Sequence, residues 1–153
     1  MIYLISLAVI LLDQASKIFI LDVMNPPQTI EILPFANIVL AYNKGVSFSM
    51  MANSSVYGPY ILAIVALLIC AGLVWWMMKE KDKWTRVGIA LIIGGAIGNV
   101  IDRFLYGAVV DFVDLHAFGY HWPAFNVADS AICIGALLIL LRAFRLSKEK
   151  KNV

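Results

Sequence analysis

Four long apolar segments, separated by polar stretches, dominate the pattern of the chain. They cover residues 2–21, 60–78, 87–103 and 127–144. Each approaches the roughly 20 residues that an α-helix needs to cross the hydrocarbon core of a bilayer. Only the second segment is free of charge, because Asp13 and Lys17 lie in the first, Asp102 and Arg103 in the third and Asp129 in the fourth. The pattern predicts four transmembrane helices, three of which carry ionisable groups.

The distribution of Lys and Arg predicts how these helices are oriented. Residues 79–86 hold four of these cations and residues 145–151 hold four more, whereas the connection between the first two helices holds only Lys44 and residues 104–126 hold none. Cytoplasmic loops of membrane proteins carry the excess of Lys and Arg. We therefore expect both termini in the cytoplasm and the two longer connections outside it.

The first of these outer connections predicts a small β-sheet. Residues 29–33 and 38–42 are rich in β-branched residues, follow Pro26 and Pro27, and are separated by Pro34. We expect a β region over residues 26–50 and an outer loop over residues 104–126. The predicted fold is an all-α membrane protein, with four transmembrane helices and a small extracytoplasmic β-sheet, in which residues 1–153 form a single membrane-embedded domain.

The composition agrees with a membrane location and excludes several functions. Hydrophobic residues make up 62% of the 153 residues and the mean hydropathy is +0.87, which is more apolar surface than a soluble domain of this size can bury. The twelve Lys and Arg occur in small groups without interleaved aromatic residues, so no nucleic acid is expected as a partner. Cys70 and Cys133 lie in apolar segments, which argues against a disulfide or a metal site.

The predicted topology brings the polar residues of several segments to one level near the outer leaflet. A charge at the centre of a transmembrane helix costs about 2.5–3.5 kcal/mol, so this convergence needs a cause. One cause is local pairing between residues four positions apart, as for Asp13 with Lys17 and Asn99 with Arg103. The converging residues are Asp13 and Lys17 in the first helix, Asn99, Asp102 and Arg103 in the third, Asp111 and Asp114 in the loop after it, and Asn126 and Asp129 at the start of the fourth.

Two of these acids, Asp111 and Asp129, have no cation nearby in the sequence. Paired aspartates can hydrolyse an amide when one carboxylate takes a proton from water and the other, kept protonated by its neighbour, polarises the carbonyl. The same acids also fit an ion- or proton-coupled transporter, and polar residues in a scaffold protein can simply hold helices together. His116 and His121 lack the spacing of a zinc pair, and we expect neither a metal nor a cofactor.

Five short motifs occur in order along the chain. They are D-Q-A-S-K at 13–17, N-K-G followed by Phe48 at 43–48, G-G-A-I-G-N-V-I-D-R at 94–103, V-V-D-F at 109–112 and F-N-V-A-D-S at 125–130. Together with four transmembrane helices, this set resembles the bacterial lipoprotein signal peptidases, the type II signal peptidases, which are membrane-embedded aspartic proteases.

The resemblance implies an endopeptidase of the bacterial cytoplasmic (inner) membrane that cleaves diacylglyceryl-modified prolipoproteins before the lipidated cysteine of the lipobox. The partners would be these substrates and membrane lipid, the active site would lie near the outer leaflet, and a monomer would suffice. Asp111 and Asp129 would be the catalytic dyad, while Asp102 is a rival acid that Arg103 is expected to neutralise. The supporting and substrate-binding residues would be Asp13, Lys17, Asn43, Gly45, Asn99, Arg103, Asn126 and Ala128.

Overall fold

The computed structural model describes residues 2–45 and 57–151, which form four helices and one antiparallel sheet. All four helices are long and apolar enough to cross a membrane, so the predicted fold class is confirmed. Phe48 and the rest of residues 46–50, the end of the expected β region, lie outside the described residues. The helices are α1 (Tyr3–Val23), α2 (Gly58–Lys79), α3 (Lys83–Tyr106) and α4 (Val127–Lys151), and the strands are β1 (Ile30–Leu33), β2 (Ala36–Asn43), β3 (Val109–Ala117) and β4 (Tyr120–His121).

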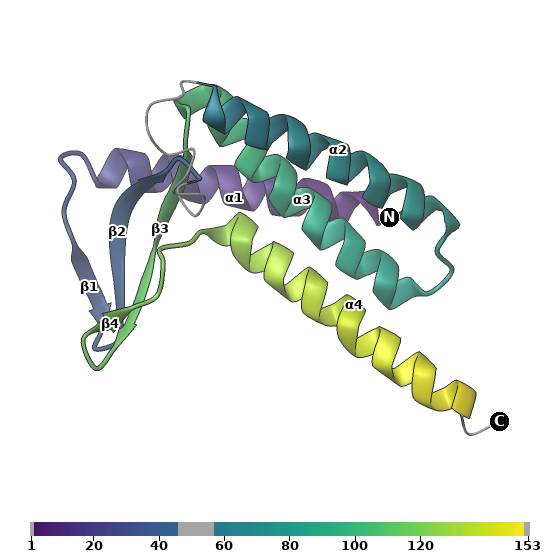
Figure 1. Cartoon of the computed structure of the whole chain (residues 1–153). Coiled ribbons are helices and arrows are strands. Elements are labelled where there is room, and N and C mark those ends of the chain that lie inside the picture. Colours follow the sequence, from purple (N-terminus) through teal and green to yellow (C-terminus); the bar gives the residue numbers. More distant parts are fainter. Residues whose placement is uncertain (1, 46–56, 152–153) are drawn as a thin grey trace.

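Helix α3 is the centre of the bundle, and the other three helices pack around it. Of its most apolar 18-residue stretch, 56% is buried, against 17–22% for the corresponding stretches of α1, α2 and α4. Small residues let the backbones approach closely, as at Gly88 of α3, whose neighbour across the interface is Gly135 of α4. Figure 1 shows α1, α2 and α4 around α3, with their remaining faces turned outward. The apolar residues on those outer faces are positioned to contact lipid.

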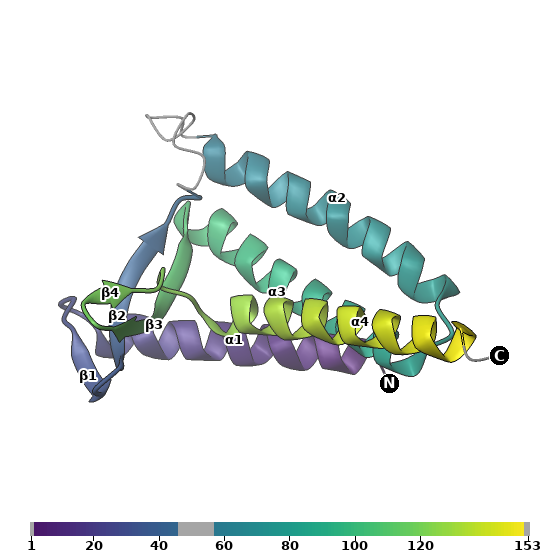
Figure 2. The ribbon, with the colours of Figure 1, turned by 60° about the horizontal axis from the view of Figure 1, so that its bottom comes forward.

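The sheet lies at one end of the helices, as both views show (Figures 1 and 2). Its strands follow the order β1-β2-β3-β4, and all neighbours are antiparallel. Ile20 and Met24 from the end of α1 pack against Phe112 of β3 in a buried cluster that joins the sheet to the bundle. Gly107 follows α3 with a φ of 67°, which suits glycine and lets the chain leave the helix and enter β3.

The connection expected over residues 104–126 contains two strands, β3 and β4, that were not predicted from the sequence. β3 is the longest strand and pairs with β2 over a register that includes Ala41 with Asp111. Its first four residues are all buried, so the sequence lacks the alternation of apolar and polar residues that marks a half-exposed strand. The strands expected at 29–33 and 38–42 correspond to β1 and to the middle of β2.

The close packing of α3 and α4 predicts that Gly88→Ala destabilises the protein. A Cβ atom at this position would lie 2.7 Å from the backbone oxygen of Gly135, so the two helices would have to separate, at a cost of about 1–3 kcal/mol. We expect a lower thermal unfolding midpoint in detergent. Gly72→Ala in α2 is the matched control, because nothing lies within 4 Å of its added Cβ, and it should leave the midpoint unchanged or raise it. Equal midpoints for the two variants would contradict the close contact.

Candidate active site

A buried lysine lies at the base of the site, between α1 and α3. Lys17 is 1% exposed, and its Nζ lies 2.8 Å from Oδ2 of Asp13 and 2.7 Å from Oδ2 of Asp102. It also donates a hydrogen bond of 3.1 Å to Oδ1 of Asn99. The pair of Asp13 and Lys17, four residues apart, was expected from the sequence. Asp102 pairs with Lys17 rather than with Arg103, so the expectation that Arg103 neutralises it is wrong.

The two acids of this ion cluster bind groups from other parts of the chain. Asp13 accepts a 2.9 Å hydrogen bond from the backbone N–H of Ala128, in the first turn of α4. Asp102 accepts 3.0 Å and 2.9 Å hydrogen bonds from the N–H of Val110 and from Nε2 of Gln14. The cluster therefore joins α1, α3, β3 and α4. Gln14 belongs to the first motif, but its contact with Asp102 was not expected, because it depends on how α1 packs on α3.

Two buried asparagine amides link the ion cluster to the paired acids. Asn99 accepts from Lys17 and donates a 2.8 Å hydrogen bond to Oδ1 of Asp129. Asn126 donates to Oδ1 of Asp111 at 2.7 Å and to Oδ1 of Asn99 at 3.2 Å. The amides thus touch both carboxylates and each other. This contact brings together Asp111 and Asp129, which are 18 positions apart in the sequence.

Asp129 occupies its position because of the helix that carries it. It lies in the first turn of α4, and its backbone N–H donates a 2.9 Å hydrogen bond to Oδ1 of Asn126. Asn126 therefore caps the helix, as its place before the apolar segment predicts. The same side chain binds Asp111 through its Nδ2, so one residue both starts α4 and spaces the two acids. Asp129 is half-buried and Asp111 is only 2% exposed.

The environment of Asp111 favours its protonated form. Burial raises the pKa of Asp111 to about 6, and the negative charge of Asp129 acts in the same direction. Hydrogen bonds from Asn43, at 3.0 Å, and from Asn126 oppose this shift and lower the pKa. Up to about pH 6 the two carboxylates consequently share an environment in which Asp111 holds a proton more readily than an ordinary aspartate does.

The remaining predicted site residues lie around this pair. Asn43, at the end of β2, is exposed and binds Oδ2 of Asp111, and its own Oδ1 accepts a 2.9 Å hydrogen bond from the N–H of Gly45. Gly45 has a φ of 84°, a conformation that glycine adopts readily. Arg103 donates a 3.0 Å hydrogen bond to the backbone oxygen of Asn99, and its buried Nε has no partner among the residues that the structure describes.

Two histidines on the sheet lie apart from the carboxylate pair. His121 contacts Asp114 at 2.9 Å, and its ring stacks on that of His116 with centroids 5.0 Å apart. The hydrogen bond from His121 lowers the pKa of Asp114. In residues 2–45 and 57–151, no group of three or more His, Cys, Asp or Glu side chains is arranged to hold a metal ion.

The chain matches known proteins along nearly its whole length. The family model described as signal peptidase (SPase) II matches residues 5–145. A lipoprotein signal peptidase of Polynucleobacter necessarius is 44% identical over 95% of this chain and 90% of its own length, and one of Aeromonas hydrophila is 45% identical over 93% and 86%. A bacterial membrane enzyme solved by the in meso method at 2.3 Å resolution superposes with a TM-score of 0.83 and 34% identity, over 96% of this chain and 89% of that one.

The buried ion cluster predicts that Lys17→Met strongly destabilises the protein. Without the ammonium group, Asp13 and Asp102 are left as unpaired carboxylates of 0% exposure, and breaking a buried pair in this way costs about 3–5 kcal/mol. We expect a large drop in the thermal unfolding midpoint in detergent. Lys44→Met removes an exposed cation and should change it little. Adding Asp102→Asn to Lys17→Met should recover part of the loss, and no recovery would argue against the charge as its cause.

Proposed function

The chain belongs to the signal peptidase II family, and on this premise we propose that Asp111 and Asp129 are the catalytic dyad with which it removes signal peptides from prolipoproteins. The chain is an aspartic endopeptidase. This family membership decides against the transporter and scaffold hypotheses. The observation that supports the dyad is the pair of asparagine amides that touch both carboxylates and each other. Asp102, the rival acid, is fully buried against Lys17 and is a supporting residue in this proposal.

The chemistry proposed for the dyad is hydrolysis by an activated water. The ionised carboxylate takes a proton from water as its oxygen attacks the scissile carbonyl carbon, and the protonated carboxyl donates a hydrogen bond to the carbonyl oxygen. The proton then passes to the leaving amine as the C–N bond breaks. The two carboxyls act as one titrating unit, so neither carries a fixed role. The raised pKa of Asp111, caused mainly by burial, supports a dyad that holds one proton.

The other polar residues of the site are proposed to hold the dyad and the substrate in place. Asn99 and Asn126 fix the carboxylates, and Asp13, Lys17 and Ala128 anchor the start of α4 behind them. Asn43, Gly45 and Arg103 are proposed to bind the substrate backbone. Positioning of this kind supplies several kcal/mol of a barrier reduction.

We propose that the substrate is the diacylglyceryl-modified prolipoprotein, cleaved before its lipidated cysteine at the outer leaflet of the bacterial cytoplasmic membrane. The acyl chains would remain in the bilayer and fix the scissile bond at the depth of the dyad. The ends of the described chain, at the start of α1 and the end of α4, lie at the end of the bundle away from the sheet (Figure 1). Together with the distribution of Lys and Arg, this supports termini in the cytoplasm. A monomer suffices, since one chain supplies every residue named.

The dyad predicts that Asp111→Asn and Asp129→Asn each abolish cleavage. Neither variant can share one proton between two carboxylates, so we expect a loss of at least about a thousandfold in kcat/KM. The measurement is a gel-shift assay of a diacylglyceryl-modified prolipoprotein in detergent or liposomes. Asp114→Asn is the control, because Asp114 lies on the same strand but pairs with His121 and Asn37, and this variant should stay near wild type. Substantial activity in Asp111→Asn would move the assignment to Asp102.

The unmodified prolipoprotein serves as a second substrate in the same assay. It should be cleaved poorly by the wild type, because nothing then holds its cleavage site at the depth of the dyad. Equal cleavage of the modified and unmodified substrates would contradict the proposed role of the lipid and leave the dyad assignment intact.

The environment of Asp111 predicts a pH limit to activity. With a pKa of about 6, Asp111 loses its proton as the pH rises through this value, and the dyad then carries two negative charges. The kcat/KM is therefore expected to fall above about pH 6. Asn43→Ala removes a hydrogen bond that lowers the pKa of Asp111, so the falling limb should move to higher pH in this variant. A limb that stays in place or moves to lower pH would contradict the prediction.

A further inference from the structure

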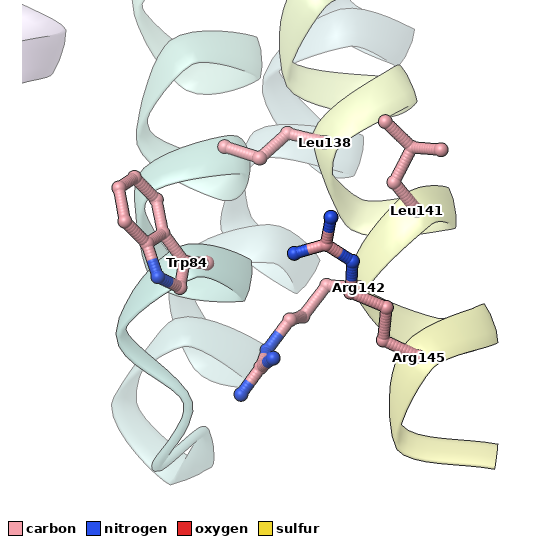
Figure 3. Close-up of a pocket in the computed structure, with 5 residues that line it drawn as sticks. All are labelled: Trp84, Leu138, Leu141, Arg142 and Arg145. Carbon is pink, nitrogen blue, oxygen red and sulfur yellow. The ribbon is translucent and has the colours of Figure 1, made fainter. Parts of the chain in front are cut away.

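A pocket lies between α3 and α4 at the end of the bundle away from the sheet, and the peptidase mechanism does not use it. Its volume is about 270 Å³. Trp84 of α3 forms one wall and α4 forms the other, as Figure 3 shows. It is lined by Trp84, Leu138, Leu141, Arg142 and Arg145, and the surface inside it is almost entirely apolar, so the two arginines contribute mainly their aliphatic stems there.

The pocket lies at the level where the apolar part of the helices ends. The stretch of α4 that is apolar enough to cross a membrane runs from Val127 to Arg145, so Arg142 and Arg145 are in its last turn. Trp84 is the second residue of α3, and tryptophan is enriched where hydrocarbon meets headgroups. Going along α4, the lining changes from Leu138 and Leu141 to the two arginines. The same change, from acyl chain to phosphate, occurs along a phospholipid.

The two arginines differ in the charge that they leave available. The Nε of Arg142 lies 2.8 Å from Oδ1 of Asp82, whose Oδ2 caps α3 by accepting hydrogen bonds from Thr85. The backbone hydrogen bond from Thr85 lowers the pKa of Asp82, which stays ionised and balances Arg142. Arg145 is exposed and forms no ion pair or hydrogen bond with any residue in the described part of the chain. Its charge is therefore available to a ligand.

The surroundings of the pocket attract anions. Residues 79–86 carry four Lys or Arg and residues 142–151 carry five, which makes nine cations against three acids in the same two segments. A cluster of this kind beside a transmembrane helix favours anionic lipid headgroups by about 1 kcal/mol for each cation near the surface. A pocket of 270 Å³ is too small for a whole phospholipid, but its apolar interior has room for part of an acyl chain, with the headgroup lying outside at the rim.

We propose that this pocket binds an anionic glycerophospholipid from the leaflet opposite the sheet, with an acyl chain against its apolar interior and the phosphate at its rim, beside the two arginines. Arg145 contacts the phosphate, Arg142 supplies its remaining N–H groups while Asp82 holds it in place, and an acyl chain lies over Leu138 and Leu141. Guanidinium groups suit this role because they bind phosphate oxygens in a planar, two-point geometry. The site is separate from Asp111 and Asp129, so it does not depend on the proposed peptidase mechanism.

Native mass spectrometry of the full-length protein in detergent tests the site. The added lipids are phosphatidylglycerol and phosphatidylcholine of the same chain length, and the readout is the fraction of protein that carries one lipid. We expect phosphatidylglycerol to bind at least about tenfold more tightly than phosphatidylcholine. Arg145→Gln should remove about tenfold of this affinity, which corresponds to about 1.4 kcal/mol.

Lys81→Gln is the matched control, because it removes one exposed charge from the same end of the protein without altering the lining of the pocket. It should change phosphatidylglycerol binding less than about threefold. An equal loss in Lys81→Gln and Arg145→Gln would show general attraction to a basic surface and overturn the site. Equal binding of both lipids would also overturn it. Glycerol phosphate, added as a soluble competitor, should not displace the lipid; displacement at equal concentration would mean that the pocket binds a soluble anion.

Discussion

The interaction on which the rest of the structure depends is the burial of Lys17 between Asp13 and Asp102. Each of these groups is at most 1% exposed, so each charge is stable only while the others are in place. Because Asp13 and Lys17 lie on α1 and Asp102 on α3, the cluster fixes how these two helices are aligned. The N–H of Val110, bound to Asp102, then sets where β3 begins, next to the acid that β3 carries at Asp111.

From this cluster outward, ordinary rules of local structure produce the arrangement of Asp111 and Asp129, the proposed dyad. Asn126 caps a helix, as asparagine commonly does, and in doing so it directs its amide at Asp111. Asp129 lies in the first turn of that helix, where a negative charge is favoured by the helix dipole. The two carboxylates therefore meet in unlike surroundings, one buried on a strand and one half-buried on a helix. This inequality lets a pair of identical side chains hold a single proton.

Much of this structure was predictable from the sequence, and the rest was not for identifiable reasons. The four transmembrane helices, the cap at Asn126 and the pair of Asp13 and Lys17 depend on near neighbours in the chain. β3 was missed because it is buried at its start, and because its partner β2 is distant in the sequence. The bond from Gln14 to Asp102 joins residues 88 positions apart and depends on helix packing. The motifs identified the participants, and only the folded chain showed their contacts.

The hydrogen bond from the N–H of Ala128 to Asp13 joins residues 115 positions apart. Because α1 is synthesised before α4, Asp13 gains this hydrogen bond only when α4 has packed beside α1, and Asp129 approaches Asp111 at that same step. A nascent or truncated chain that lacks α4 has neither the N–H partner of Asp13 nor Asp129, the second acid of the proposed dyad. With Asp111 and Asp129 as the proposed dyad, the order of synthesis therefore delays the pairing of the two acids until the fourth helix is in the membrane.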